Sequence, residues 1–107
     1  LSSNFFAVKK GRILTAGKGV LPGVTRSLVI DAAQRAGFPI LFCPITIHDL
    51  GAIEEAFITS SSRGVLPIVR VDERDIGNGY PGAITQTIAR LYDLNVDRLL
   101  EPIYLAR

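Results

Sequence analysis

Two short stretches of this 107-residue chain carry residue types that bind anions. In the first, Leu-Pro-Gly-Val-Thr-Arg, Pro22 and Gly23 end a loop, and Val24 and Thr25 open a run with helical periodicity. The first N–H groups of a helix lack partners within it and point outward at the positive end of the helix dipole. Such a helix end binds phosphate readily, although an ordinary helix start that holds only water has the same local pattern.

The second stretch is a run of three serines, Ser60 to Ser62, followed by Arg63. Hydroxyl and N–H groups there can hold a phosphate by hydrogen bonds, and the Arg63 guanidinium matches a carboxylate with two parallel bonds. An ordinary polar loop with a surface cation has the same composition. If both stretches are functional, we expect them to come together around a single dianionic group.

The elements that must position these stretches follow from hydrophobic patterns. Residues 4–10 and 13–16 read as paired strands, and 17–23 reads as a glycine-rich loop. Apolar residues then recur at helical spacing up to Ala36, where Gly37 ends the helix. The short apolar run 39–45 suits a buried strand.

The second half of the chain is also predicted to contain both strands and helices. We expect a short helix within 47–55 that begins at His48 or Asp49, a strand from Ala56, and a hairpin over 66–77. His48, a lone histidine beside acidic residues, is expected to be a solvated or capping side chain, with a general base as the alternative. No second histidine exists to build a metal site with it.

A second helix is predicted after the glycine-rich loop 77–82. The preceding hairpin should turn near residues 73–74, and Pro102 should break any helix in the C-terminal tail. Strands and helices are thus mixed, with hairpins toward both ends, so the fold class is mixed α/β or α+β.

Composition bounds the function. The net charge of +2, from twelve Lys and Arg against ten Asp and Glu, is too even to indicate nucleic acid or an anionic membrane as a partner. A hydrophobic share of 48% and a mean hydropathy of +0.31 are high for one small domain, which suggests a neighbour that covers apolar surface. The chain opens on a strand-like segment without Met, so we expect further sequence before Leu1.

Cys43 is the single cysteine of the sequence. It lies in an apolar run, where a small buried side chain is a more ordinary role than a reactive thiol. A lone cysteine suits a reducing compartment, so we expect a cytoplasmic protein, with an organellar stroma or matrix as the alternative.

The sequence resembles the C-terminal half of the fold-type IV pyridoxal-phosphate enzymes, the class IV aminotransferases. That group includes branched-chain aminotransferase, D-amino acid aminotransferase and aminodeoxychorismate lyase. Five segments in family order carry the resemblance: S-S-N-F-F from Ser2, L-P-G-V-T-R from Leu21, E-A-F-I-T-S-S from Glu55, V-L-P-I-V from Val65 and I-G-N-G-Y-P-G-A-I-T from Ile76. The fold it implies is the C-terminal pseudo-barrel domain of those enzymes, with hairpins and two main helices.

The resemblance implies a site for pyridoxal 5'-phosphate. Leu21 would pack on a face of the cofactor ring, while the N–H groups of Val24 and Thr25 and the Thr25 hydroxyl would bind its phosphate. Ser61 would also contact the phosphate, and Gly23 belongs to the same helix opening.

It also implies roles for the remaining polar residues of these motifs. Ser62 and Arg63 would lie where the substrate carboxylate is received, and Ser60 would belong to the cofactor-binding strand end. Three further residues match a segment that runs under the ring: Ser2, Ser3 and Asn4. The sequence departs from the family where Tyr80 replaces the usual Lys of a loop and Ala83 replaces a frequent Pro.

The implied activity is amino-group transfer between an amino acid and a 2-keto acid. In the family the Schiff-base lysine and the carboxylate that pairs with the pyridine nitrogen both precede the position of Leu1, and Lys9, Lys10 and Lys18 match neither. Residues 1–107 are therefore expected to be the phosphate-binding domain of a larger homodimeric enzyme, inactive without its N-terminal domain. The alternatives are a lyase related to aminodeoxychorismate lyase, and a non-catalytic binding domain that retains the fold.

Overall fold

The computed structural model describes residues 3–17, 24–60 and 63–105. The elements within them are β1 (Ser3–Lys9), β2 (Arg12–Thr15), α1 (Val24–Arg35), β3 (Ile40–Phe42), the 3-10 helix η1 (Ile47–Ala52), β4 (Glu55–Ser60), β5 (Gly64–Ile68), β6 (Arg70–Val71), β7 (Arg74–Asp75) and α2 (Ala83–Leu105). This is the mixed class that the sequence predicts, with two main helices.

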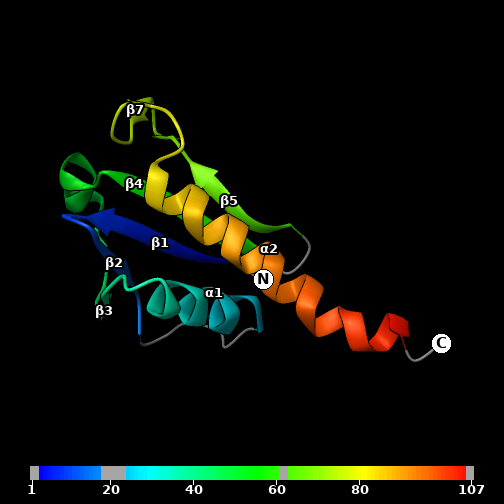
Figure 1. Ribbon diagram of the computed structural model, residues 1–107. Coiled ribbons are helices and arrows are strands. Elements are labelled where there is room, and N and C mark those ends of the chain that lie inside the picture. Colours follow the sequence, from blue (N-terminus) through cyan, green and yellow to red (C-terminus); the bar gives the residue numbers. More distant parts are fainter. Residues whose placement is uncertain (1–2, 18–23, 61–62, 106–107) are drawn as a thin grey trace.

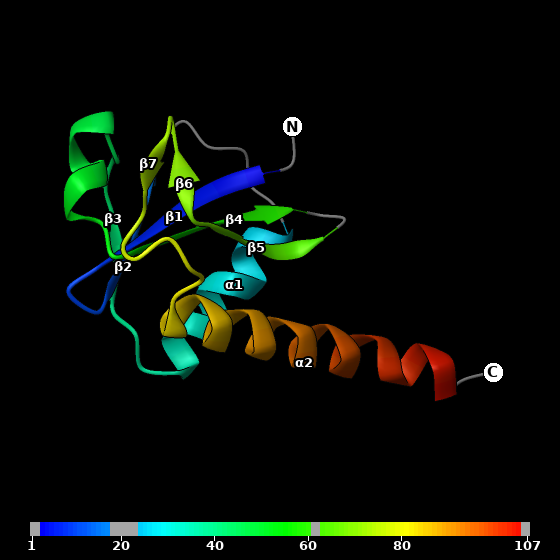
Figure 2. The same cartoon turned by 90° about the horizontal axis from the view of Figure 1, so that it is seen from above.

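Five strands form one sheet in the order β3-β2-β1-β4-β5, and β6 and β7 form a separate hairpin. All neighbours in the large sheet are antiparallel except β2 and β3, which are parallel. Both α-helices cover one face of this sheet, while η1 and the small hairpin lie on the other (Figures 1 and 2). The C-terminal part of α2 reaches well beyond the sheet.

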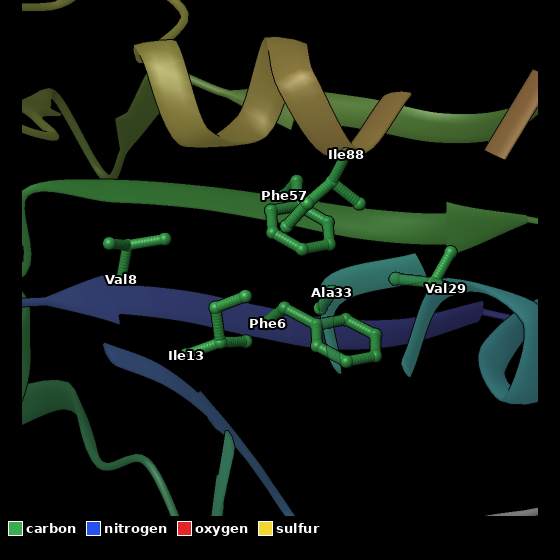
Figure 3. Close-up of a cluster of buried hydrophobic side chains, with 7 residues drawn as sticks. All are labelled: Phe6, Val8, Ile13, Val29, Ala33, Phe57 and Ile88. Carbon is green, nitrogen blue, oxygen red and sulfur yellow. The ribbon is translucent and has the colours of Figure 1, made fainter. Parts of the chain in front are cut away.

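The core on the helix-bearing face is built around two stacked rings. Phe6 of β1 lies opposite Phe57 of β4, with ring centroids 4.9 Å apart and planes only 5° from parallel. Val29 and Ala33 of α1 and Ile88 of α2 close over these rings (Figure 3). A second apolar cluster lies on the opposite face. Because alternate residues of a strand face opposite sides, β4 supplies both clusters.

α1 ends in a common C-terminal capping motif, at the glycine where the sequence predicts its end. Gly37 has φ +88°, its N–H donates to the Gln34 carbonyl, and the Phe38 N–H donates to the Ala33 carbonyl. These two bonds make a Schellman motif, which satisfies carbonyls that the helix end leaves free. The predicted glycine stop is confirmed, with α1 ending at Arg35.

The first turn of α2 is held by a carboxylate from the sheet. Glu55 of β4 accepts hydrogen bonds from the backbone N–H groups of Ile84, at 3.2 Å, and Thr85, at 2.7 Å. The approach is close enough that a Cβ on Gly82 would overlap the Glu55 side chain. A carboxylate at this position satisfies two unpaired donors and faces the positive end of the helix dipole.

Glu55→Gln is expected to lower the free energy of unfolding by about 1–2 kcal/mol, because a neutral amide replaces a charged acceptor of two bonds. Urea unfolding followed by circular dichroism measures the change. The exposed Glu73→Gln is a matched control, expected to change stability by less than about 0.5 kcal/mol. Equal stabilities for the two variants would show that the Glu55 contact contributes nothing.

A second carboxylate, that of Asp49 within η1, caps the start of that helix. The Asp49 carboxylate accepts bonds from the Thr46 backbone N–H, at 2.8 Å, and from the Thr46 hydroxyl, at 3.1 Å. Both bonds favour the ionised form and lower the pKa of Asp49 below its ordinary value of 3.8. The prediction that η1 starts at His48 or Asp49 was wrong, because the Asp49 side chain reaches back to Thr46 and the helix begins at Ile47.

A lowered folded-state pKa means that ionised Asp49 stabilises the fold above the unfolded pKa, and that this contribution is lost as pH falls through the folded pKa. Asp49→Asn is therefore expected to be less stable than the parent at pH 7, with the difference shrinking below the ordinary pKa of 3.8 and lost as pH falls through the lower folded-state pKa. Thermal unfolding at a series of pH values measures it. A difference that is independent of pH would contradict the ionised cap.

Two other sequence predictions, for a strand and for a hairpin, need correction. The strand expected over 39–45 covers only Ile40–Phe42, because Pro39 and Pro44 cannot donate to a ladder. The hairpin expected over 66–77 is wrong in its first half, where residues 66–68 pair with β4 instead. Its remainder turns at Asp72 and Glu73, both at positive φ.

The prediction that Pro102 breaks the C-terminal helix was also wrong. α2 is continuous from Ala83 to Leu105 and includes Pro102. A proline removes one backbone bond and crowds the preceding turn, but Leu, Arg and Glu, which are good helix formers, precede it here. The helix therefore passes through the proline.

Candidate functional site

Three elements that the sequence motifs occupy meet at one end of the sheet. The start of α1 lies beside the end of β4, and the start of β1 pairs with that same end of β4 (Figures 1 and 2). The helix opening and the serine-rich strand end are therefore brought to the same region, as their proposed shared ligand requires. Five predicted site residues lie outside the described residues: Ser2, Leu21, Gly23, Ser61 and Ser62.

The opening of α1 has the character of an anion site. Val24 is the first residue of the helix and its side chain is 77% exposed, while Thr25 is half-buried. The first turn of α1 contains no acidic residue, which is the usual internal partner of a helix N-terminus. Among the described residues, the first turn of α1 therefore offers no carboxylate to the positive end of the helix dipole.

The pairing of β1 with β4 determines which polar residues lie on the same face as α1. Asn4 lies opposite Thr59 on the face that carries the helices, whereas Ser60, paired with Ser3, is one position further along β4 and lies on the other face. Asn4 and Ser60 are half-buried. Of these two predicted cofactor residues, Asn4 is therefore the one on the side of α1.

Thr59 is a polar residue that the sequence reasoning missed. It is fully buried, and its hydroxyl has no hydrogen-bond partner within the described parts of the chain. Two-residue alternation from the buried Phe57 would have placed Thr59 toward α1. A buried hydroxyl without a partner costs free energy, so among the described residues Thr59 is a hydrogen-bonding group at this end of the helix-bearing face that no contact satisfies.

Arg63 lies in the turn between β4 and β5, and its side chain is exposed. The next residue, Gly64, has φ +73° and packs so closely on the Tyr92 ring that a Cβ would come within 2.7 Å of it. Tyr92 belongs to α2, so this contact fixes the turn against the long helix. Arg63 is accordingly an exposed guanidinium on an anchored turn, a geometry compatible with a carboxylate partner.

Arg26 is the second residue that the sequence reasoning missed, because its position in the helical pattern placed it on the polar side of α1. It is half-buried: its guanidinium donates to the Ala16 carbonyl at the end of β2 and lies 5.9 Å from the ring centres of both Phe6 and Phe42. The signal that would have found it is the pair of aromatic residues on strands flanking β2. A cation between two rings is a stabilising arrangement.

Apolar surface remains open near this region. Phe42 is 55% exposed, and with Cys43 it lines an open hollow of about 680 Å³ beside the end of β2. Cys43 is half-buried, which is less than the buried position expected of it. Exposed Leu41 and Phe42 agree with the expectation of apolar surface beyond what one small domain covers.

The described residues show no arrangement suited to a metal ion or a membrane span. No group of three or more His, Cys, Asp or Glu side chains among them is placed to hold a metal, and His48 is exposed. Neither of the helices they include is long and apolar enough to cross a bilayer.

Comparison with known proteins matches this architecture. Residues 1–71 match the family model for amino-transferase class IV. A putative branched-chain-amino-acid aminotransferase of Methanocaldococcus jannaschii is 36% identical over 87 residues, which are 79% of this chain and 30% of that protein. A D-alanine aminotransferase of Listeria monocytogenes is 29% identical over 108 residues, covering 99% of this chain and 37% of that protein.

Solved structures give the same result. The branched-chain amino acid aminotransferase of T.th., with pyridoxamine 5'-phosphate, superposes with a TM-score of 0.81 at 29% identity, over 85% of this chain and 31% of that one. This chain thus spans about a third of the length of the relatives it matches. The fold agrees with that of the solved structure, and the chain belongs to the amino-transferase class IV family.

Proposed function

We propose that the protein containing this chain transfers an amino group between an amino acid and a 2-keto acid, with pyridoxal 5'-phosphate as cofactor. The observation that carries the proposal is the acid-free first turn of α1, placed beside the end of β4. Family membership supports the reaction class, and a structural neighbour that holds pyridoxamine 5'-phosphate supports the cofactor.

The described residues fit the phosphate of this cofactor. The N–H groups of Val24 and Thr25 would donate to phosphate oxygens, and the Thr25 hydroxyl would add a third bond. The Thr59 hydroxyl, which has no partner among the described residues, is on the same face of the sheet as α1. Hydrogen-bond donors at a helix N-terminus hold a dianion without a large formal charge, in keeping with the net charge of +2.

The bound cofactor would act as the electron sink for bonds broken at the amino acid Cα. The residues of this chain would fix its phosphate through α1 and orient the ring above the start of β1, where Asn4 lies. Arg63, exposed on its anchored turn, would receive the substrate carboxylate through a two-point contact. Each of these is a binding or orienting role, and the proton-transferring group must come from elsewhere in the protein.

We further propose that the remaining two thirds of such an enzyme form an N-terminal domain that supplies the lysine, and that the enzyme is a homodimer in a reducing compartment. The relatives' greater length supports the additional domain. Exposed apolar residues such as Phe42 support a covering neighbour, and the lone Cys43 supports the compartment.

The test uses the protein expressed from its complete reading frame. With pyridoxal 5'-phosphate, an L- or D-amino acid and 2-oxoglutarate, we expect a new keto acid and glutamate in equal amounts, whereas the 107-residue chain alone should form neither. Cleavage of aminodeoxychorismate to pyruvate and an aromatic amine, without glutamate formation, would identify a lyase instead. Absence of both cofactor binding and turnover would support the non-catalytic alternative and overturn the proposal.

A further inference from the structure

Arg26 connects the opening of α1 to three strands of the sheet. Its guanidinium donates to the carbonyl of Ala16, which directly follows β2, and it lies at the same distance, 5.9 Å, from the rings of Phe6 and Phe42. These rings belong to β1 and β3, the two neighbours of β2. The side chain therefore contacts both flanking strands and ends on the middle one.

The position of this contact matters because Arg26 directly follows Val24 and Thr25. Both amides proposed to bind phosphate lie in the same helical turn as its backbone. A rigid, planar guanidinium with one hydrogen bond and two ring contacts has little freedom to shift. The Arg26 side chain consequently ties the first turn of α1 to the sheet.

The positive charge of Arg26 is also unusual for its position in α1. A cation in the first turn of a helix opposes the helix dipole, and no acidic residue in that turn compensates it. Its Nε atom is buried and has no hydrogen-bond partner within the described residues. Such an arrangement is unfavourable in an isolated helix and becomes favourable when a dianion occupies the helix opening.

We propose that Arg26 is a positioning residue for the cofactor phosphate: it fixes the first turn of α1 against β1, β2 and β3 and so presets the Val24 and Thr25 amides. This inference rests on the proposed function. It assigns Arg26 no contact with the phosphate; its effect passes through the helix opening.

The test compares the affinity of the complete protein for pyridoxal 5'-phosphate with its affinity for pyridoxal, which lacks the phosphate. Arg26→Lys keeps the charge but loses the planar group that fits between the rings, so the dissociation constant for pyridoxal 5'-phosphate should rise roughly tenfold. The dissociation constant for pyridoxal should stay within about twofold. Fluorescence titration measures both without turnover.

A second, milder variant tests the same contact in case Arg26→Lys fails to fold. Phe42→Leu removes one of the two rings at a site that is 55% exposed, and it should weaken pyridoxal 5'-phosphate alone by about twofold to fivefold. Arg35→Lys, at the opposite end of α1 in an exposed pair with Asp31, is the matched control and should change neither constant.

Two outcomes overturn the inference. Arg26→Lys that binds pyridoxal 5'-phosphate as the parent does would show that the contact positions nothing. Equal losses for the phosphorylated and unphosphorylated compounds would show a merely structural residue. If the parent protein itself shows no preference for the phosphorylated compound, the proposed function fails first, so that failure is distinguishable from failure of the Arg26 assignment.

Discussion

Phe57→Ala is expected to lower the free energy of unfolding by about 3–5 kcal/mol, the usual cost of truncating a fully buried ring. Phe57 has no exposed surface and stacks on Phe6 at 4.9 Å. Val29 of α1 and Ile88 of α2 belong to the same buried cluster, so the cavity would open where both helices meet the sheet. Chemical denaturation of the purified protein measures the loss.

The same truncation at Phe42 is the control for this prediction. Phe42 is 55% exposed on the edge strand β3, and Phe42→Ala should cost about 1 kcal/mol or less. A Phe57→Ala variant that is no less stable than Phe42→Ala would contradict the description of the stacked rings as the centre of the core.

Val24→Glu is expected to have opposite effects on stability and on cofactor affinity. A carboxylate at the first position of α1 faces the positive end of the dipole, so the protein without cofactor should gain about 0.3–1 kcal/mol of stability. The same carboxylate would repel a phosphate dianion at the helix opening, and affinity for pyridoxal 5'-phosphate should fall about tenfold to a hundredfold. Thermal unfolding and fluorescence titration measure the two effects.

Val24→Gln is the control, since it changes size and polarity similarly but adds no charge. Because the Val24 side chain is 77% exposed, neither substitution disturbs packing. If Val24→Glu and Val24→Gln bind the cofactor equally well, the phosphate does not lie at the opening of α1.

Much of the secondary structure on the helix-bearing side of the sheet could be predicted from the sequence, because the patterns that indicate it involve residues close together in the chain. The period of apolar residues and the Gly37 stop define α1, and the apolar run around Phe57 indicates β4. Motif order indicated the family, which the match over residues 1–71 confirms. Whether the assigned site residues bind cofactor and substrate stays a prediction.

The features that the sequence did not reveal depend on contacts between distant residues. Arg26 belongs to the polar side of α1 by spacing, and its partners come from distant parts of the chain: the Ala16 carbonyl and the rings of Phe6 and Phe42. The Glu55 cap on α2 joins residues 29 and 30 positions apart. Residues 66–68 pair with β4 and not with the segment that follows them. This pairing also depends on tertiary structure, because without it β4 would be an unpaired edge of the sheet.

The central claim is that the opening of α1, beside the end of β4, holds the phosphate of the cofactor. A crystal structure of the complete protein with pyridoxal 5'-phosphate tests it most directly. We expect phosphate oxygens within about 2.7–3.2 Å of the Val24 and Thr25 backbone nitrogens. A phosphate bound elsewhere, with only water at the first turn of α1, would contradict the claim.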